Sequence, residues 1–261
     1  MEDRDRGFWR KRDGVVNPIL KGIVFLVCLA LPLTGLANTL ALDRLETLRD
    51  LARYVALLED ADGQLEAGAV KNRLPSAWSR TDERTLQLGS SDSAWWVRFD
   101  LNNAGDVPAT RLLEVGWPLL NYLDVYVYEG DQLKATVLTG DQRPFVNRPL
   151  PSRTFVIPLV VEPGHQQTVL LRLAMHSGIF YAVPLRLWLK TDFYAQSSTD
   201  NLIHGAYLGA ILALLLYNIL LFLSTQDNNL LLYSFYLGSF SLWNIGFDGL
   251  GLQYLWQDAA W

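Results

Sequence analysis

Nine side chains in the middle of the chain combine aromatic rings with charges, at spacings typical of strand faces. In the segment 94–101, Val97 and Phe99 point to one side of a strand, while Trp96 and Arg98 point to the other. The same period of two recurs in 121–128, 168–175 and 183–189. The outward positions of interest are Trp96, Arg98, Tyr122, Asp124, Tyr126, Arg172, His176, Arg186 and Trp188.

Such side chains are suited to binding a small ligand. Aromatic planes stack on the apolar faces of sugars, and Arg or Asp side chains bind hydroxyl or carboxylate groups, so the pattern favours a carbohydrate-like ligand. Two alternatives stay open at this point. The same face could pack against another domain or against membrane helices, or its side chains could simply form cross-strand pairs.

No catalytic or metal-binding pattern accompanies these residues. The three histidines, His165, His176 and His204, lack the spacing of a zinc site, and the phosphate-binding glycine loops and the nucleophile elbow are missing. The acidic segment 59–63 resembles the start of a calcium loop, but the Glu required at its twelfth position is absent, so it predicts a turn. We therefore expect no enzyme, no metal and no cofactor. A glycan hydrolase would need two carboxyl groups facing each other across about 5–9.5 Å.

Short alternating segments separated by turn residues indicate an all-β domain. Strands are expected over 53–59, 94–101, 110–115, 121–128, 133–138, 153–161, 168–175 and 183–189. Short helices are expected at 64–72 and 43–52. Strands of this length and spacing predict a mainly β fold, a jelly roll or β-sandwich.

The amino terminus has the features of an export signal. Four basic residues, Arg10, Lys11, Arg12 and Lys21, precede an apolar run over 22–33, and the small residues Gly35 and Ala37 follow it. This predicts a signal peptide over 1–37, with an uncleaved anchor helix as the alternative. The single cysteine, Cys28, lies within it, so the mature chain would lack thiols and disulfides.

The carboxyl-terminal part predicts a transmembrane hairpin. The segment 202–223 carries no charge and is long enough to span a bilayer, and 230–247 follows after a polar turn. The pair Gly205 and Gly209 predicts close helix packing. His204 and Asn218 are polar groups within the first span, and the place of His204 in its first turn favours the interface. The signal peptide would put 38–200 outside and the turn 224–229 in the cytoplasm.

The composition agrees with a β-domain followed by membrane helices, and it excludes several classes of protein. Charged residues make up 19% of the 261 residues, mean hydropathy is +0.12, and the net charge is −5. A mildly acidic chain without a basic cluster excludes nucleic acid as a partner. The aromatic content excludes a disordered chain.

The order of these parts resembles a bacterial family. The segments WWVRFDLNN at 95–103, PLRLWLKTDFY at 184–194 and the stretch from Gly205 to Trp256 are similar to seven-transmembrane receptors with diverse intracellular signalling modules (7TMR-DISM). The resemblance implies a carbohydrate-binding-like jelly roll (the type 2 extracellular domain) followed by the first two membrane helices. It places the Trp-x-Arg strand start of that family on Trp96 and Arg98, and it adds Arg153 and Arg172 as landmarks.

The expected domains are therefore a signal peptide (1–37), a periplasmic sensor-like domain (38–200) and the start of a seven-helix region (201–261) in the bacterial inner membrane. The expected function is sensory input: an envelope ligand, carbohydrate-like, is bound outside and relayed to the helices. The alternatives are a membrane-tethered protein-interaction module and a non-functional truncated receptor fragment. The expected partners are membrane lipid, a carbohydrate or other small ligand, and a second copy or a signalling protein.

Overall fold

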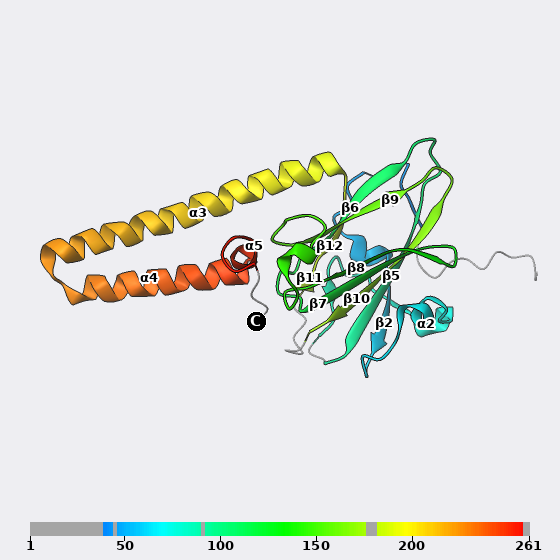
Figure 1. The fold of residues 1–261 in the computed structure, drawn as a ribbon, viewed down its shortest axis with the longest axis horizontal. Coiled ribbons are helices and arrows are strands. Elements are labelled where there is room, and N and C mark those ends of the chain that lie inside the picture. Colours follow the sequence, from blue (N-terminus) through cyan, green and yellow to red (C-terminus); the bar gives the residue numbers. More distant parts are fainter. Residues whose placement is uncertain (1–38, 44–45, 90–91, 176–181, 258–261) are drawn as a thin grey trace, which may run out of the picture. The chain divides into compact units, whose positions relative to one another are not determined.

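The computed structural model describes residues 39–257 except 44–45, 90–91 and 176–181. The predicted signal peptide and the candidate His176 lie outside the described residues. The predicted fold class is confirmed, because the described residues form a β-sandwich followed by two long apolar helices (Figure 1).

The larger sheet of the sandwich has seven strands. Six follow the order β3-β2-β5-β10-β7-β8, and β1 pairs in parallel with the end of β5. The strands are β1 (Thr39–Ala41), β2 (Ala56–Asp60), β3 (Ser79–Arg80), β5 (Ala94–Asn102), β7 (Tyr122–Glu129), β8 (Gln132–Thr139) and β10 (Gln166–Ala174).

The smaller sheet has the order β12-β6-β9, and β11 and β4 form a separate pair. Its strands are β6 (Ala109–Val115), β9 (Phe155–Val161) and β12 (Leu185–Trp188), and the separate pair is β4 (Leu86–Gln87) and β11 (Ala182–Val183). Short helical turns are η1 (Leu51–Tyr54), α2 (Ala67–Lys71), η2 (Pro75–Ala77) and η3 (Phe145–Asn147).

The main core lies between the two sheets. Val97, Phe99 and Leu101 of β5 are fully buried, as the alternation predicts, and they belong to one cluster with Phe155 and Leu187 of the smaller sheet. Burial of aliphatic and aromatic side chains at about 1.5–3 kcal/mol each is the main force that holds the two sheets together.

A second cluster lies on the other side of the larger sheet. Trp96 is only 1% exposed there, packed with Val70 of α2, Trp78, Tyr128 and Leu170. The alternation therefore gives the correct side for Trp96, but that side is covered rather than open.

Several predicted element boundaries differ from the observed ones. The expected strand 183–189 is interrupted at Pro184, which lacks the N–H that a continuous ladder needs, so β11 and β12 are separate. The expected helix 43–52 is wrong in its described part: Leu48 exchanges backbone hydrogen bonds with Leu187, at 2.8 Å each, and η1 alone is helical there. The expected helix 64–72 is shorter, and 53–59 divides between η1 and β2.

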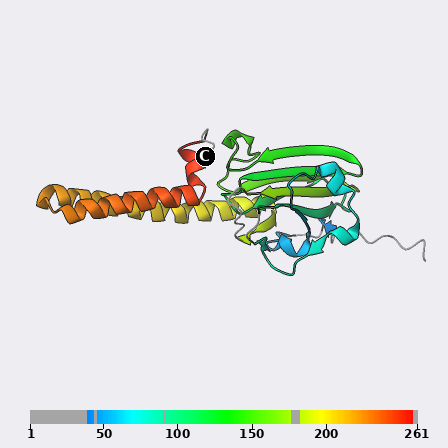
Figure 2. The ribbon, with the colours of Figure 1, turned by 90° about the horizontal axis from the view of Figure 1, so that it is seen from below.

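Two long helices follow the sandwich. They are α3 (Lys190–Thr225) and α4 (Asn228–Phe247), and the short helix α5 (Leu250–Tyr254) comes next. The first begins well before the expected span at 202. Both are long and apolar enough to cross a membrane, and they lie side by side in antiparallel orientation (Figure 1, Figure 2). In the turn between them, the backbone of Gln226 adopts the left-handed conformation, with φ +55°. The Asp227 carboxylate accepts a hydrogen bond from the Asn229 N–H at 2.9 Å and caps the start of α4.

Gly140 follows β8, at a point where its backbone approaches that of Asn121 closely. Its φ is +145°, and a Cβ built on it would lie 1.9 Å from the carbonyl oxygen of Asn121. We expect Gly140→Ala to lower the free energy of unfolding by about 1–3 kcal/mol, because it combines backbone strain with a steric clash. Gly130→Ala is the control, since Gly130 has φ +55° but open space around it. A denaturant titration that finds equal losses would contradict the steric part of this argument.

Candidate functional site

The ten predicted ligand residues fall into two groups. Six lie on the outer side of the larger sheet: Trp96, Arg98, Tyr122, Asp124, Tyr126 and Arg172. Arg153, Arg186 and Trp188 lie together beside the smaller sheet and α3, and His176 is outside the described residues. No single site therefore contains all the described candidates.

Strand register brings the first group together. Arg172 of β10 pairs with Trp96 of β5 on one side and with Asp124 of β7 on the other. Tyr122 and Tyr126 are two residues from Asp124 along β7, so their rings project from the same side of the sheet. We call Tyr122, Asp124, Tyr126 and Arg172 the tyrosine face.

A network of charges crosses the tyrosine face. The Asp124 carboxylate accepts a hydrogen bond from Arg143 Nη1 at 2.5 Å, and Arg172 Nη1 lies 3.7 Å from its other oxygen. Arg143 also donates to the Thr139 carbonyl at 2.8 Å and stacks its guanidinium 5.2 Å from the Tyr122 ring centroid. Sequence reasoning missed Arg143, because it lies in the loop after β8, where no periodicity marks orientation.

Two hollows border the tyrosine face, and Arg172 lines both. One has a volume of about 360 Å³ and contains Tyr122, Arg143, Asp62 and Asp92. The other has a volume of about 520 Å³ and contains Tyr126, Tyr128 and Glu66. Their linings combine aromatic rings with both signs of charge, which suits a polar ligand with apolar faces.

The Tyr126 hydroxyl remains protonated near neutral pH. Burial, together with the nearby Asp124 carboxylate, raises the pKa of Tyr126 above its usual value, against opposing effects of Arg172 and Arg143. The phenol therefore offers both a donor and an acceptor to a bound molecule.

Two further candidates on this side have structural partners. The indole N–H of Trp96 donates to Asp60 Oδ2 at 3.3 Å, and its ring stacks with Tyr126 at a centroid distance of 5.9 Å. Arg98 donates to the Lys71 carbonyl at 3.2 Å, at the end of α2. The Asp60 carboxylate also accepts from the N–H groups of Gln64 and Leu65, so the acidic segment 59–63 contributes to a turn.

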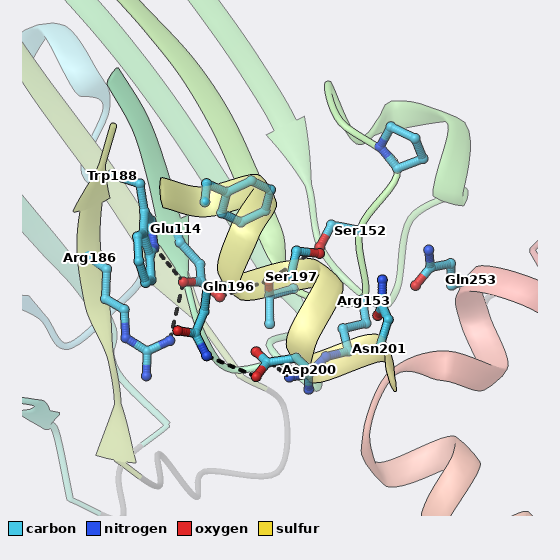
Figure 3. A pocket seen from close by; sticks show the side chains of 13 residues that line it. Glu114, Ser152, Arg153, Arg186, Trp188, Gln196, Ser197, Asp200, Asn201 and Gln253 are labelled. Carbon is cyan, nitrogen blue, oxygen red and sulfur yellow. Dashed lines mark hydrogen bonds and ion pairs between the residues drawn. The ribbon is translucent and has the colours of Figure 1, made fainter. Parts of the chain in front are cut away.

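The second group surrounds a small polar cavity of about 60 Å³, which we call the junction cavity (Figure 3). Glu114 is buried at its base and accepts from Thr154 Oγ1 at 3.0 Å, Arg186 Nη1 at 3.1 Å and Trp188 Nε1 at 2.8 Å. On the other side, Asp200 of α3 lies 3.7 Å from Arg153.

The junction cavity lies between the sandwich and the start of α3, and the residues around it connect the two. Phe193 in the first turn of α3 packs edge-on against Trp188 at 6.3 Å, and Thr47 Oγ1 accepts from the Leu189 N–H at 3.1 Å. The side chains around this cavity bond mainly to one another, so the geometry favours a packing role for Arg186 and Trp188.

Gly205 and Gly209 of α3, for which close helix packing is expected, have open surroundings. A Cβ built on Gly205 or Gly209 meets no described atom within 4 Å, whereas one on Gly238 of α4 lies 3.5 Å from Leu215. The helices thus approach closely at Gly238 in this structure, and a packing role for Gly205 and Gly209 stays a prediction. Among the described residues, no cluster of three His, Cys, Asp or Glu side chains is arranged for a metal.

Three solved structures show remote similarity to this chain. A β-glucosidase from Kluyveromyces marxianus is 11% identical, with a TM-score of 0.31, over 55% of this chain and 17% of its own. The pre-peptidase C-terminal domain of a Bacillus anthracis collagenase is 6% identical, with a TM-score of 0.21, over 35% and 74%. A glucanotransferase from Paenibacillus sp. is 13% identical, with a TM-score of 0.25, over 58% and 19%. The chain thus spans less than a fifth of the glucosidase and the glucanotransferase.

Models of protein families match this chain, whereas curated single proteins do not. No curated protein matches the chain. The model of the 7TMR-DISM extracellular 2 domain matches residues 52–189, and that of the 7TM diverse intracellular signalling region matches 200–261. The first match covers the sandwich except β1, and the second covers most of the helical region. The chain belongs to the 7TMR-DISM family of membrane sensory receptors, with an extracytoplasmic β-domain followed by membrane helices.

Proposed function

We propose that the tyrosine face binds a small carbohydrate-like ligand and that this binding is the sensory input of the receptor. In this proposal residues 38–200 lie in the periplasm, the helices lie in the bacterial inner membrane, and residues 1–37 direct export. The supporting observation is the position of Tyr122 and Tyr126 beside the paired charges of Asp124, Arg143 and Arg172, at the border of two hollows.

The chemistry of the tyrosine face supports a ligand with hydroxyl groups. A tyrosine ring offers a flat apolar surface, and its hydroxyl can donate or accept a hydrogen bond. Asp124 of β7 and its cross-strand partner Arg172 of β10 provide an acceptor and a donor on the same side of the sheet. A sugar ring, with apolar faces and hydroxyl groups at its rim, matches this combination.

The test is calorimetric titration of the full chain in lipid nanodiscs with a set of neutral and uronic-acid oligosaccharides. We expect one of them to bind, and Tyr126→Ala to weaken that binding by about tenfold, the effect of losing one aromatic contact. Val160→Ala is the control, because Val160 is an exposed side chain on β9 of the other sheet.

Tyr126→Phe separates the two contributions of the ring. Retained affinity in this variant would assign the effect to stacking, and a loss would assign it to the hydroxyl. Absence of binding to every oligosaccharide, or an unchanged affinity in Tyr126→Ala, would overturn the proposal and favour a face that docks a protein.

A further inference from the structure

A histidine on α3 reaches the carboxyl end of α4. His204 Nε2 lies 3.6 Å from Asp248 Oδ2, and His204 Nδ1 lies 2.7 Å from the backbone carbonyl oxygen of Asp200. Asp248 caps α4, with its N–H donating to the Asn244 carbonyl. The imidazole therefore has one fixed partner on its own helix and one on the neighbouring helix.

The partner on α3 determines where the ring carries its hydrogen. A carbonyl oxygen only accepts, so Nδ1 must be the donor in the bond to Asp200. A neutral ring then has a lone pair on Nε2, which faces the Asp248 carboxylate and is repelled by it. A protonated ring has an N–H and a positive charge at the same place, so the contact between the helices depends on a proton.

Asp248 lies between the carboxyl end of α4 and the amino end of the short helix α5. The dipole of α4 opposes its carboxylate and that of α5 favours it, so a nearby cation adds further stabilisation. Residues 202–261 contain no Lys or Arg, and His204 is the one basic side chain among them.

The remaining charged and titratable groups around His204 come from three elements. Asp200 lies one turn earlier on α3, and Arg153, from the loop before β9, lies 3.7 Å from its carboxylate. Tyr254 of α5 lines the same cavity of about 310 Å³ as His204. Arg153 thus neutralises Asp200 rather than Asp248, and the proton on His204 is the charge available to Asp248 among the described residues.

We propose that His204 and Asp248 form a proton-binding site that ties α3 to the end of α4 when the imidazole is protonated and releases it when the imidazole is neutral. A proton would then be a second input to the receptor, applied at the helices and independent of any ligand on the tyrosine face. An imidazole is suited to this role, because Nε2 can gain or lose a proton while Nδ1 keeps its hydrogen bond to the Asp200 carbonyl.

The tautomer is the first test and leaves His204 itself unaltered. The full chain with His165→Gln and His176→Gln retains His204 as its only histidine. In nanodiscs at about pH 8, we expect the neutral ring to give ¹⁵N resonances of the Nδ1–H form. Detection of the Nε2–H form would overturn the proposal.

The second test measures the coupling between the two side chains. Unfolding of the full chain is followed for His204→Phe, Asp248→Asn and the double variant at about pH 5 and about pH 8. We expect a coupling of about threefold in the unfolding equilibrium constant at the lower pH and none at the higher pH. Equal coupling at both values, or none at either, would contradict a proton-dependent contact.

A second histidine–carboxylate pair provides the control. His165 Nδ1 lies 2.7 Å from Glu129 Oε1 on the sandwich, away from the helices. His165→Gln should leave the coupling between His204 and Asp248 unchanged at both pH values.

Discussion

Replacement of Trp96 by alanine is expected to lower the free energy of unfolding by about 3–5 kcal/mol. Trp96 is 1% exposed and fills the space between the larger sheet and α2, in contact with Val70 and Leu170. Its removal leaves a cavity that the fixed strands β5 and β10 cannot close. It also removes the indole donor to Asp60, which organises the turn after β2.

Denaturant unfolding followed by circular dichroism measures this loss. Leu133→Ala is the control: Leu133 lines a hollow of the same face but is 46% exposed, so a change of less than about 1 kcal/mol is expected. If Trp96→Ala were as stable as this control, the second cluster would not be closed in solution. Trp96 would then be available for direct contact with a ligand.

Because Trp96 supports Tyr126, binding experiments on variants of the two residues have different meanings. Tyr126 rests against the Trp96 ring, so loss of Trp96 would also displace Tyr126. A weaker affinity in Trp96→Ala therefore reports on the support of the tyrosine face. Variants of Tyr126, whose ring lines a hollow, report on the contact itself.

Periodicity predicts which side of a strand a residue occupies, but it does not predict what covers that side. Trp96 and Trp188 both face away from the main core, as expected from alternation. Both are nevertheless buried, because segments distant in sequence cover them: α2 covers Trp96, and Phe193 of α3 packs on Trp188. Which segments cover a strand face depends on tertiary packing, and the pattern of one strand carries no information about that packing.

Strong periodicity predicts the regular elements well, whereas irregular segments carry no such pattern. The expected strand 94–101 closely matches β5, and the apolar spans at 202–223 and 230–247 lie within α3 and α4. The error at 43–52 has a specific cause: Leu48 makes its backbone bonds with Leu187, more than a hundred residues away. Arg143 lies in a loop, so no pattern marked its contact with Asp124.

Removal of the Glu114 carboxylate is the second substitution with a large expected effect. Glu114 is 7% exposed and satisfies three donors at once, on Thr154, Arg186 and Trp188. Glu114→Ala leaves the buried Trp188 N–H unpaired and leaves the Thr154 hydroxyl with only the Ser152 hydroxyl at 3.5 Å. It also leaves the Arg186 charge without a counterion among the described residues. Breaking a buried pair in this way is expected to lower the free energy of unfolding by about 3–5 kcal/mol.

Glu129→Ala is the matched control, because Glu129 pairs with Lys134 and His165 in an exposed position and its loss should cost less than about 1 kcal/mol. Hydrogen exchange provides a local readout for Glu114→Ala. Since Trp188 packs on Phe193, backbone amides in the first turns of α3 should exchange faster in this variant than in Glu129→Ala. Unchanged exchange in α3, together with a large loss of stability, would show that Glu114 holds the smaller sheet together without fixing the start of the helix. Faster exchange confined to α3 would instead identify Glu114 as the residue through which the sandwich orients the first membrane helix.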